Sequence, residues 1–190
     1  MKWPLPIISL FIIFLSGCTS MIHLGYTPAI NKCETNNIAL QVTTIDDQRT
    51  NKKTIGALRN LYGMPIVKIA TNDNVPDWVT NALKLELSNA GYIIDEKGSD
   101  ANYLIEGKLL HAFASTYFIY HGRMKIDISL KRDDNVIFHK VYATKKSHGV
   151  NWIVQTSICA KTLELNLQEV CKRFITDLNH KLLEGDLKIE

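Results

Sequence analysis

Side chains that could carry out catalysis or bind a metal are scattered along this 190-residue chain. None of its six histidines stands in a metal-ligand spacing such as HExxH, so the sequence predicts no metal site. The acidic pairs Asp46-Asp47 and Asp133-Asp134 fall in predicted turns, where aspartate is favoured because it hydrogen-bonds the nearby backbone. The sequence contains neither a glycine-rich phosphate loop nor a nucleophile elbow. It therefore predicts no catalytic residue and no cofactor.

Cys18 has the most informative sequence context. It follows an uncharged apolar run at residues 5–15 and the small residues Ser16 and Gly17, which is the pattern of a secretory signal. The apolar run is about 11 residues long, whereas a helix that crosses a membrane needs about 20. We therefore expect residues 1–17 to be a cleaved signal peptide rather than a permanent span.

Residues 15–18, Leu-Ser-Gly-Cys, resemble a bacterial lipobox. The resemblance implies cleavage between Gly17 and Cys18 and attachment of lipid, palmitate included, to Cys18. One acyl chain is a marginal membrane anchor, but two or more give a stable one. Many Gram-negative lipoproteins that stay in the inner membrane have an aspartate directly after the lipidated cysteine, whereas this chain has Thr19. The same analogy therefore implies an outer-membrane anchor and a domain that faces the periplasm.

Three further cysteines, Cys33, Cys159 and Cys171, would lie in an oxidising compartment. Cys159 and Cys171 fall on one predicted helix, roughly 18 Å apart, and a disulfide needs Cα atoms within about 7 Å. We expect these two to be buried as small hydrophobic residues. A bridge from Cys33 to one of them stays open.

Composition and charge are those of an ordinary globular chain. The net charge of +3 is too small to indicate nucleic-acid binding, and the basic residues are spread along the sequence. After the signal peptide we expect an acylated N-terminus and tether at residues 18–37, a single domain at residues 38–185 and a tail at residues 186–190.

The first half of the domain is predicted to be short strands around one helix. Asp73 or Asn74 can cap the start of that helix, and Gly91 can end it. Trp78, in the first turn, is expected to be partly exposed or at an edge of the packing, with a role in packing favoured over a role in binding. The flanking segments are a strand at residues 38–44, a shaped loop at 54–63, a strand at 66–70 and a short strand at 92–95.

The second half is predicted to be an antiparallel meander followed by a long helix. Met124, Ile126 and Ile128 alternate with polar residues, so one face of their strand is buried. An apolar stripe predicts a helix over residues 154–183 that lies on the sheet. The remaining elements are strands at 103–114, 123–131 and 136–144, a tight turn at 133–135 and a loop at 145–152. The predicted fold class is α+β: a largely antiparallel sheet with two helices packed on one face.

Aromatic residues occupy two predicted loops, where polar residues are usual. They are Tyr62 in one loop and Tyr117, Phe118 and Tyr120 near the first turn of the meander. One interpretation is a long hairpin with aromatic strand ends. The other is a contact surface for a protein or lipid at one end of the sheet, because exposed aromatic residues mark interfaces.

The order of these motifs resembles the YajG-type family of uncharacterised Gram-negative lipoproteins over residues 38–183. The matching features are the lipobox, Asp46-Asp47-Gln48-Arg49 after the first strand, the glycine loops at residues 55–56 and 62–63, Val75-Pro76-Asp77-Trp78 at the helix start and Ala90-Gly91-Tyr92 at its end. The layout is also similar to that of auxiliary lipoproteins of envelope ABC transport systems. That similarity implies binding rather than catalysis.

These observations favour a non-enzymatic, outer-membrane-anchored lipoprotein with an accessory or adaptor role in the bacterial envelope. Its expected partners are the membrane, through acyl chains on Cys18, and an envelope protein or lipid. An alternative is a periplasmic carrier that shelters a lipid or other apolar ligand between the helices and the sheet. A periplasmic hydrolase is the third hypothesis, and it requires a clustered serine, histidine and aspartate or paired carboxylates in a cleft. A pocket in which His111, His139 and an acidic residue meet would favour it.

Overall fold

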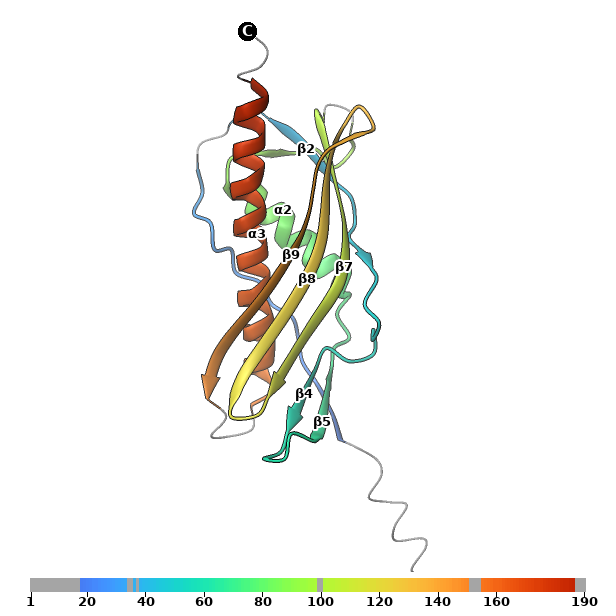
Figure 1. Ribbon diagram of the computed structural model, residues 1–190, viewed down its shortest axis with the longest axis vertical. Coiled ribbons are helices and arrows are strands. Elements are labelled where there is room, and N and C mark those ends of the chain that lie inside the picture. Colours follow the sequence, from blue (N-terminus) through green and yellow to red (C-terminus); the bar gives the residue numbers. More distant parts are fainter. Residues whose placement is uncertain (1–17, 34–35, 37, 99–100, 151–154, 187–190) are drawn as a thin grey trace, which may run out of the picture.

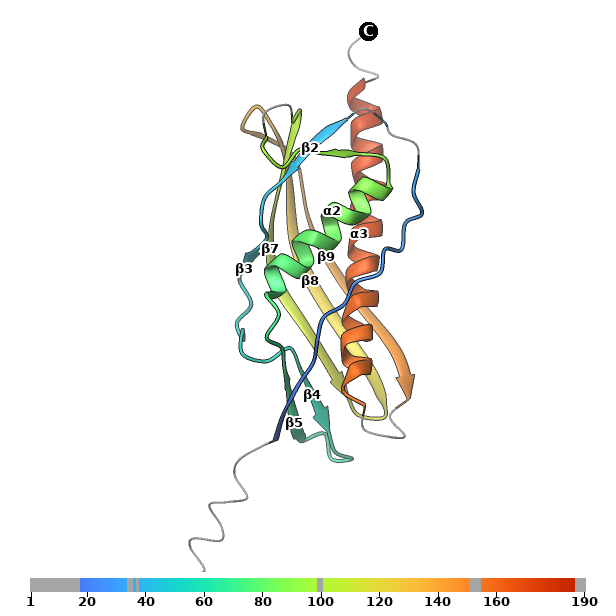
Figure 2. The same ribbon diagram turned by 180° about the vertical axis from the view of Figure 1, so that it is seen from behind.

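One face of the sheet carries both helices, as Figures 1 and 2 show from opposite sides. The computed structural model describes residues 18–33, 36, 38–98, 101–150 and 155–186. The predicted signal peptide and most of the predicted tail lie outside the described residues. Within them, two helices pack on a large, mostly antiparallel sheet, and the predicted α+β class is confirmed.

The sheet has nine strands in the described part of the chain. They are β1 Cys18–Met21, β2 Ala39–Val42, β3 Asp46–Asp47, β4 Gly56–Arg59, β5 Pro65–Ala70, β6 Ile93–Ile94, β7 Tyr103–Thr116, β8 Ile119–Arg132 and β9 Asn135–Val150. The main order is β1-β5-β4-β7-β2-β6, with β3 on β7 and β8 between β7 and β9. The β7–β8–β9 meander is antiparallel, whereas β1 runs parallel to β5 and β4 runs parallel to β7.

Alternating side chains build the meander. On β8, Met124, Ile126 and Ile128 are each 1% exposed, and the residues between them lie on the opposite face. The β8–β9 turn has positive φ at Asp133 (47°) and Asp134 (64°), as a type I′ hairpin requires. Residues 145–150, predicted as a loop, instead extend β9, because β9 stays paired with β8 along its whole length.

The helices are α2, Val75–Asn89, and α3, Ser157–Asp186. The Asn74 side chain caps α2 by accepting a hydrogen bond from the Asp77 backbone N–H (3.4 Å), and Gly91 follows the helix with a φ of 97°. Both features agree with the prediction. The predicted α3 stripe is buried throughout, and its members are Cys159, Leu163, Leu167, Val170, Cys171, Phe174, Leu178 and Leu182. The cysteines are free thiols.

Two local features differ from the predictions. Residues 56–59 form β4 rather than a loop, because Gly56 allows β4 to approach β7 closely: a Cβ there would lie 2.5 Å from the Ala114 carbonyl oxygen. Trp78 is 8% exposed instead of lying at an edge. Its indole N–H donates a hydrogen bond to the Gly25 carbonyl oxygen (3.0 Å), because the N-terminal segment lies across α2.

The N-terminal segment differs most from the prediction. Residues 18–33 lie along the domain rather than forming a tether (Figure 2). Here β1 pairs with β5, and Ile22 and Leu24 are buried while His23 and Gly25 between and after them are exposed. This alternation attaches the segment to the core as a strand would. We call residues 22–33 the N-terminal strap.

Candidate functional site

Two loops meet at one end of the sheet (Figure 1). Because β4 runs parallel to β7, with Leu58 opposite Thr116, the β4–β5 loop and the β7–β8 turn begin at the same level. The Tyr117 hydroxyl donates a hydrogen bond to the Leu61 carbonyl oxygen and joins the two loops. Segments far apart in the sequence therefore form one surface.

Polar groups hold the β4–β5 loop in a defined shape. The Asn60 side-chain oxygen accepts hydrogen bonds from the backbone N–H groups of Tyr62 and Met64, both at 3.0 Å. Gly63 supplies a positive φ of 79°, and the Arg59 guanidinium donates to its carbonyl oxygen (2.8 Å). These hydrogen bonds fix the conformation of the loop, so its apolar side chains are held in exposed positions.

Large apolar side chains are exposed on these two loops and on the strand residues beside them. Tyr62 is 87% exposed and Phe118 is 54% exposed. The surface holds seven of the twelve exposed large apolar residues in the described part of the chain. We call it the apolar end, and its residues are Leu61, Tyr62, Met64, Ile66, Tyr117, Phe118 and Ile119.

Three of the four aromatic residues predicted for a contact surface belong to the apolar end. Tyr62, Tyr117 and Phe118 are exposed, and the last two rings meet edge to face with centroids 4.5 Å apart. Tyr120 does not belong to it, because it is fully buried and its hydroxyl accepts a hydrogen bond from the Gln155 backbone N–H (3.1 Å). The long hairpin of the other interpretation is also present, so the two interpretations are compatible.

The predicted lipid-attachment residue lies at the same end. Cys18 is exposed and begins β1 opposite Val67 of β5. Val67 is three residues from Met64, so Cys18 lies about 10 Å from the loop along the strand direction. Among the described residues, no helix is both long and apolar enough to cross a membrane.

Asp73 provides one attachment for the N-terminal strap. Its carboxylate accepts a hydrogen bond from the Leu24 backbone N–H (2.6 Å) and contacts the His23 ring nitrogen (3.0 Å). The Leu24 hydrogen bond holds the pKa of Asp73 below its ordinary value; partial burial opposes this, and the Thr71 hydroxyl and His23 reinforce it. The strap is thus tied to the residue that precedes the α2 cap.

Glu86 provides the second attachment. It is fully buried in α2 and accepts hydrogen bonds from the Tyr26 hydroxyl (2.6 Å) and the backbone N–H groups of Ala29 (2.7 Å) and Ile30 (2.9 Å). Burial, with Cys171 and Glu86 nearby, raises the pKa of Tyr26, so its hydroxyl stays protonated as a donor. A buried carboxylate requires donors of this kind. The start of the domain is therefore fixed relative to its core.

Sequence reasoning missed the strap and its two carboxylates. One signal was available for Glu86, which lies three residues after Leu83 on the apolar face of α2, where an acidic side chain needs buried donors. The identity of those donors was not available, because Tyr26 lies 60 positions away in the chain.

The residues named for a hydrolase do not meet in one site. His139 Nε2 lies 2.6 Å from Asp127 Oδ1, and Ser129 is directly opposite His139. In the described part of the chain no hydrogen bond joins that serine to the ring, as an activated nucleophile would need. His111 lies opposite Lys125, which is four residues from Ser129 on β8. His111 is therefore about 14 Å from the level of Ser129 and His139 along the strand direction. No group of three or more candidate ligands among the described residues could hold a metal ion.

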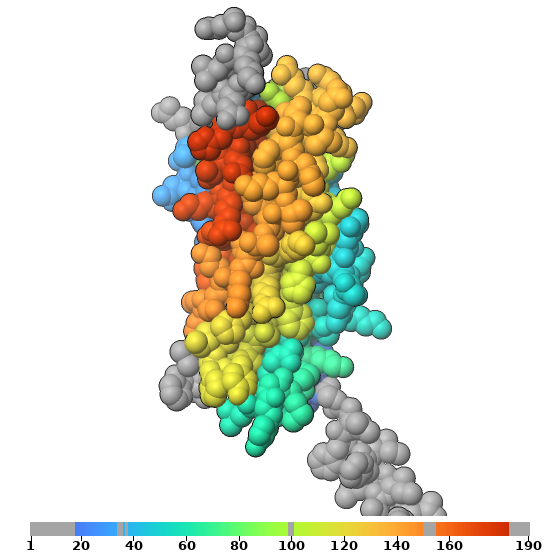
Figure 3. Space-filling view, viewed as in Figure 1, coloured from blue at the N-terminus to red at the C-terminus, as the bar shows by residue number. Residues whose placement is uncertain are grey.

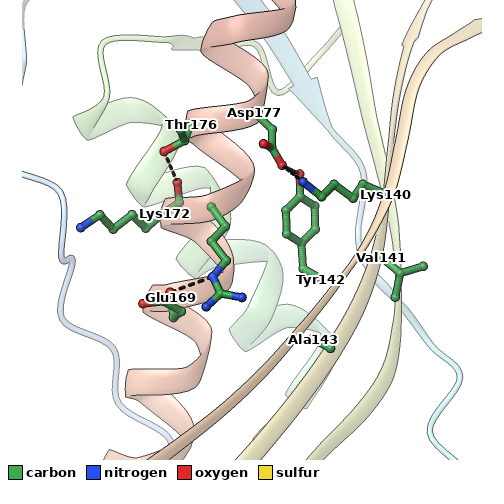
Figure 4. Close-up of a pocket in the computed structure, with 9 residues that line it drawn as sticks. Lys140, Val141, Tyr142, Ala143, Glu169, Lys172, Thr176 and Asp177 are labelled. Atoms are coloured by element: carbon green, nitrogen blue, oxygen red, sulfur yellow. Dashed lines mark hydrogen bonds and ion pairs between the residues drawn. The ribbon is translucent and has the colours of Figure 1, made fainter.

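A groove of about 480 Å³ lies between β9 and α3 (Figure 4). Its walls carry the ion pairs Lys140–Asp177 (2.6 Å) and Arg173–Glu169 (2.7 Å). The Tyr142 hydroxyl also donates to Asp177 (2.7 Å), and burial together with this carboxylate raises the pKa of Tyr142. Pockets for apolar ligands are lined mainly by hydrophobic side chains, so this charged groove gives the carrier hypothesis no support.

Neither a family model nor a curated protein matches the chain, so the resemblance to the YajG-type family stays a prediction. Solved structures do match. Protein XCC0632 from Xanthomonas campestris, of family DUF330, has a TM-score of 0.62 at 9% identity, over 90% of this chain and 99% of that one. The chain shares its fold.

Two further bacterial structures give the same result. Hypothetical protein CT253 from Chlamydia trachomatis has a TM-score of 0.53 at 9% identity, over 74% of this chain and 95% of that one. A putative neuraminyllactose-binding hemagglutinin homolog from Helicobacter pylori has a TM-score of 0.52 at 10% identity, over 89% of this chain and 100% of that one. At these identities the similarity is one of fold alone.

Proposed function

We propose that this protein is a non-enzymatic lipoprotein of the bacterial cell envelope, anchored by acyl chains on Cys18, with its apolar end against the membrane. In that position it acts as an accessory or adaptor for other envelope components. The lipobox analogy favours the outer membrane, with the domain facing the periplasm.

The observation that carries this proposal is the coincidence of the apolar end with Cys18. A surface rarely gathers this many large apolar side chains unless they make a contact. Tyrosines such as Tyr62 and Tyr117 suit the membrane–water boundary, because each ring has an apolar body and a polar hydroxyl. The strap adds support, since it leaves no long spacer between the anchor and the domain.

The fixed anchor also supports an adaptor role. A domain on a flexible tether samples many orientations, whereas the Asp73 and Glu86 attachments hold the N-terminal strap in one place. The groove between β9 and α3 would then stand at a constant height above the membrane. A neighbouring envelope protein would meet it in one orientation, which reduces the entropic cost of binding.

The test places a tryptophan at the apolar end of the acylated protein in lipid vesicles. Tyr62→Trp is compared with Val136→Trp, an exposed apolar position beside the opposite turn. Brominated lipids quench tryptophans that reach the acyl chains, so we expect quenching of Tyr62→Trp well above the background of the native tryptophans. Val136→Trp should stay at that background. Equal quenching of the two variants would contradict the proposed orientation.

The adaptor role needs a separate experiment. The acylated protein is cross-linked in intact cells, captured and analysed by mass spectrometry, with Cys18→Ser as the mislocalised control. A discrete envelope protein that is recovered only with the anchored form supports the adaptor. Recovery of lipid alone would favour the carrier.

A further inference from the structure

The face of the meander opposite the helices is open along its three long strands (Figure 3). On β8 it consists of the residues between the buried Met124, Ile126 and Ile128, together with their cross-strand neighbours on β7 and β9. We call it the outer face. It is solvated, and its side chains are mostly charged or polar, as expected for the exposed side of an antiparallel sheet.

Charges on the half of the outer face near the β8–β9 turn are paired. Lys131 Nζ lies 2.7 Å from Glu106 Oε2, and His139 Nε2 lies 2.6 Å from Asp127 Oδ1. Lys108, also on this half, lies directly opposite Asp127, so each of these three basic groups has a carboxylate beside it on the neighbouring strand. This half of the face needs no external ion.

On the half near the apolar end, the charged side chains are all basic. Arg123 lies directly opposite Lys145, and Lys125 is the next outward residue on β8. All three are exposed, and among the described residues none of them forms an ion pair with a carboxylate. We call these three residues the basic cluster.

The basic cluster lies in a region of positive potential. Like charges directly opposite each other in a sheet destabilise it, and Arg123 and Lys145 stand in that relation. His111, opposite Lys125, is affected by the same potential: burial lowers its pKa, and Arg123 and Arg49 lower it further. An anion bound at this half of the face would relieve the repulsion.

The position of the basic cluster along the strand fits the headgroup layer of a membrane. Arg123 is five residues from Phe118, which is about 17 Å along a strand. The headgroup layer is about 5 to 8 Å thick on each side of the bilayer, and apolar side chains at the boundary enter by about 5 to 10 Å. Arg123 and Lys145, which lie opposite each other, would then be within about a Debye length, 8 to 10 Å, of the lipid phosphates, and Lys125, about 7 Å farther along the strand, would lie near the outer limit of that range.

We propose that Arg123, Lys125 and Lys145 bind the phosphate groups of anionic phospholipids in the membrane on which the domain stands. This inference rests on the proposed function, because it uses the same orientation. The apolar end supplies contact with the acyl boundary, and the basic cluster makes that contact selective for anionic lipid. Together they hold the apolar end and the adjoining half of the outer face at the membrane surface.

The test uses the mature chain with Cys18→Ser, which lacks only the acyl chains that would otherwise mask weaker binding. Binding is measured by sedimentation with vesicles of phosphatidylcholine alone or with about 30% phosphatidylglycerol, at low and high salt. A basic residue near an anionic surface contributes about fivefold in affinity, so three contribute about a hundredfold. We expect a preference of that order for the anionic vesicles at low salt, and its loss at high salt.

The decisive variant is Arg123→Gln/Lys125→Gln/Lys145→Gln. Its matched control, Lys97→Gln/Lys172→Gln/Lys181→Gln, removes the same charge from exposed positions off the outer face. The preference should disappear in the first and remain within about twofold in the second. Equal losses in both would show a response to net charge and overturn the proposal, as would equal wild-type binding to the two kinds of vesicle.

Two further measurements keep the alternatives apart. Inorganic phosphate without vesicles should leave the melting temperature of the wild type unchanged, and a rise that the cluster variant abolishes would assign the site to free phosphate and overturn the lipid proposal. The variant Tyr62→Ser/Phe118→Ser should weaken binding to neutral vesicles while keeping the anionic preference. If this variant binds neutral vesicles as well as the wild type does, the apolar contact of the proposed function is contradicted. The preference for anionic vesicles still tests the role of the basic cluster independently.

Discussion

The two turns of the meander have opposite chemistry. The β8–β9 turn has Asp133 and Asp134 in left-handed conformations, and the Asn135 side chain donates a hydrogen bond to the Asp133 carbonyl oxygen (3.1 Å), so polar residues close this hairpin. The β7–β8 turn exposes Tyr117 and Phe118 and adjoins a second loop with apolar side chains. Because the first turn shows that polar residues are sufficient to close a hairpin, folding alone does not account for the apolar residues of the second.

The contrast between the two ends can be tested first at the N-terminal strap, which helps to fix the position of Cys18 relative to the apolar end. Glu86→Ala leaves the Tyr26 hydroxyl and two backbone N–H groups without their acceptor in the interior. We expect the free energy of unfolding, measured in urea, to fall by about 3 kcal/mol. The strap should also loosen, so that the proposed acyl anchor on Cys18 would hold the apolar end less firmly against the membrane.

The control for this change is Glu96→Ala. Glu96 has a side chain that is 79% exposed and only a distant ion pair with Lys84, at 3.9 Å. Its substitution should alter the free energy of unfolding by less than about 0.5 kcal/mol. Similar losses for the two variants would mean that the buried carboxylate does not hold the strap.

A substitution in the polar turn should affect stability without affecting membrane contact. Asp134→Val places a β-branched residue at a φ of 64°, which costs about 1 to 2 kcal/mol in the left-handed region. Urea unfolding measures this loss, and lipid quenching of Tyr62→Trp in the same background should not change. Asp134→Gly is the control, and it should be at least as stable as the wild type because glycine adopts this conformation freely.

The pH dependence of stability tests the attachment of the strap to Asp73. The folded-state pKa of Asp73 is lowered by the hydrogen bond from Leu24, so its contribution is complete above the ordinary carboxyl value of 3.8 and is lost as the pH falls below it. The stability difference between the wild type and Asp73→Asn should therefore shrink as the pH falls from 5 towards 3. Since other carboxylates titrate in the same range, the comparison between the two proteins is the measurement. A stability difference between the two proteins that stays constant from pH 5 to pH 3 would contradict the proposed role of the Asp73 carboxylate.

The sequence predicted the elements that depend on local patterns and missed those that depend on distant contacts. The meander follows from alternation, as at Ile126, and the α2 boundaries follow from Asn74 and Gly91. The placement of β1 and the strap was missed because the pairing of β1 with β5 and the hydrogen bonds of the strap to Glu86 join residues about 50 or 60 positions apart. The sequence pattern of residues 18–37 contains no signal that identifies β5 or Glu86 as their partners.

The aromatic residues of the apolar end were predicted except for one error, the inclusion of Tyr120, which was avoidable. Tyr120 and Met124 are an even number of residues apart on β8, so alternation alone places them on the same, buried face. Tyr117 and Phe118 lie in the turn and escape that constraint. The meeting of Tyr62 with this turn could not be predicted, because it depends on the parallel pairing of β4 with β7.

The smallest expected change in stability belongs to the apolar end itself. Tyr62→Ser/Phe118→Ser removes two exposed rings, so the free energy of unfolding should change by less than about 0.5 kcal/mol per site. If these residues served the fold, as one interpretation of the hairpin holds, the loss would instead approach the several kcal/mol of a buried aromatic residue. Val136→Ser, at the opposite end, is the matched control for exposed apolar area. Because neither substitution should unfold the domain, a weaker contact with neutral vesicles in the double variant, absent in Val136→Ser, would assign the apolar end to the membrane rather than to folding.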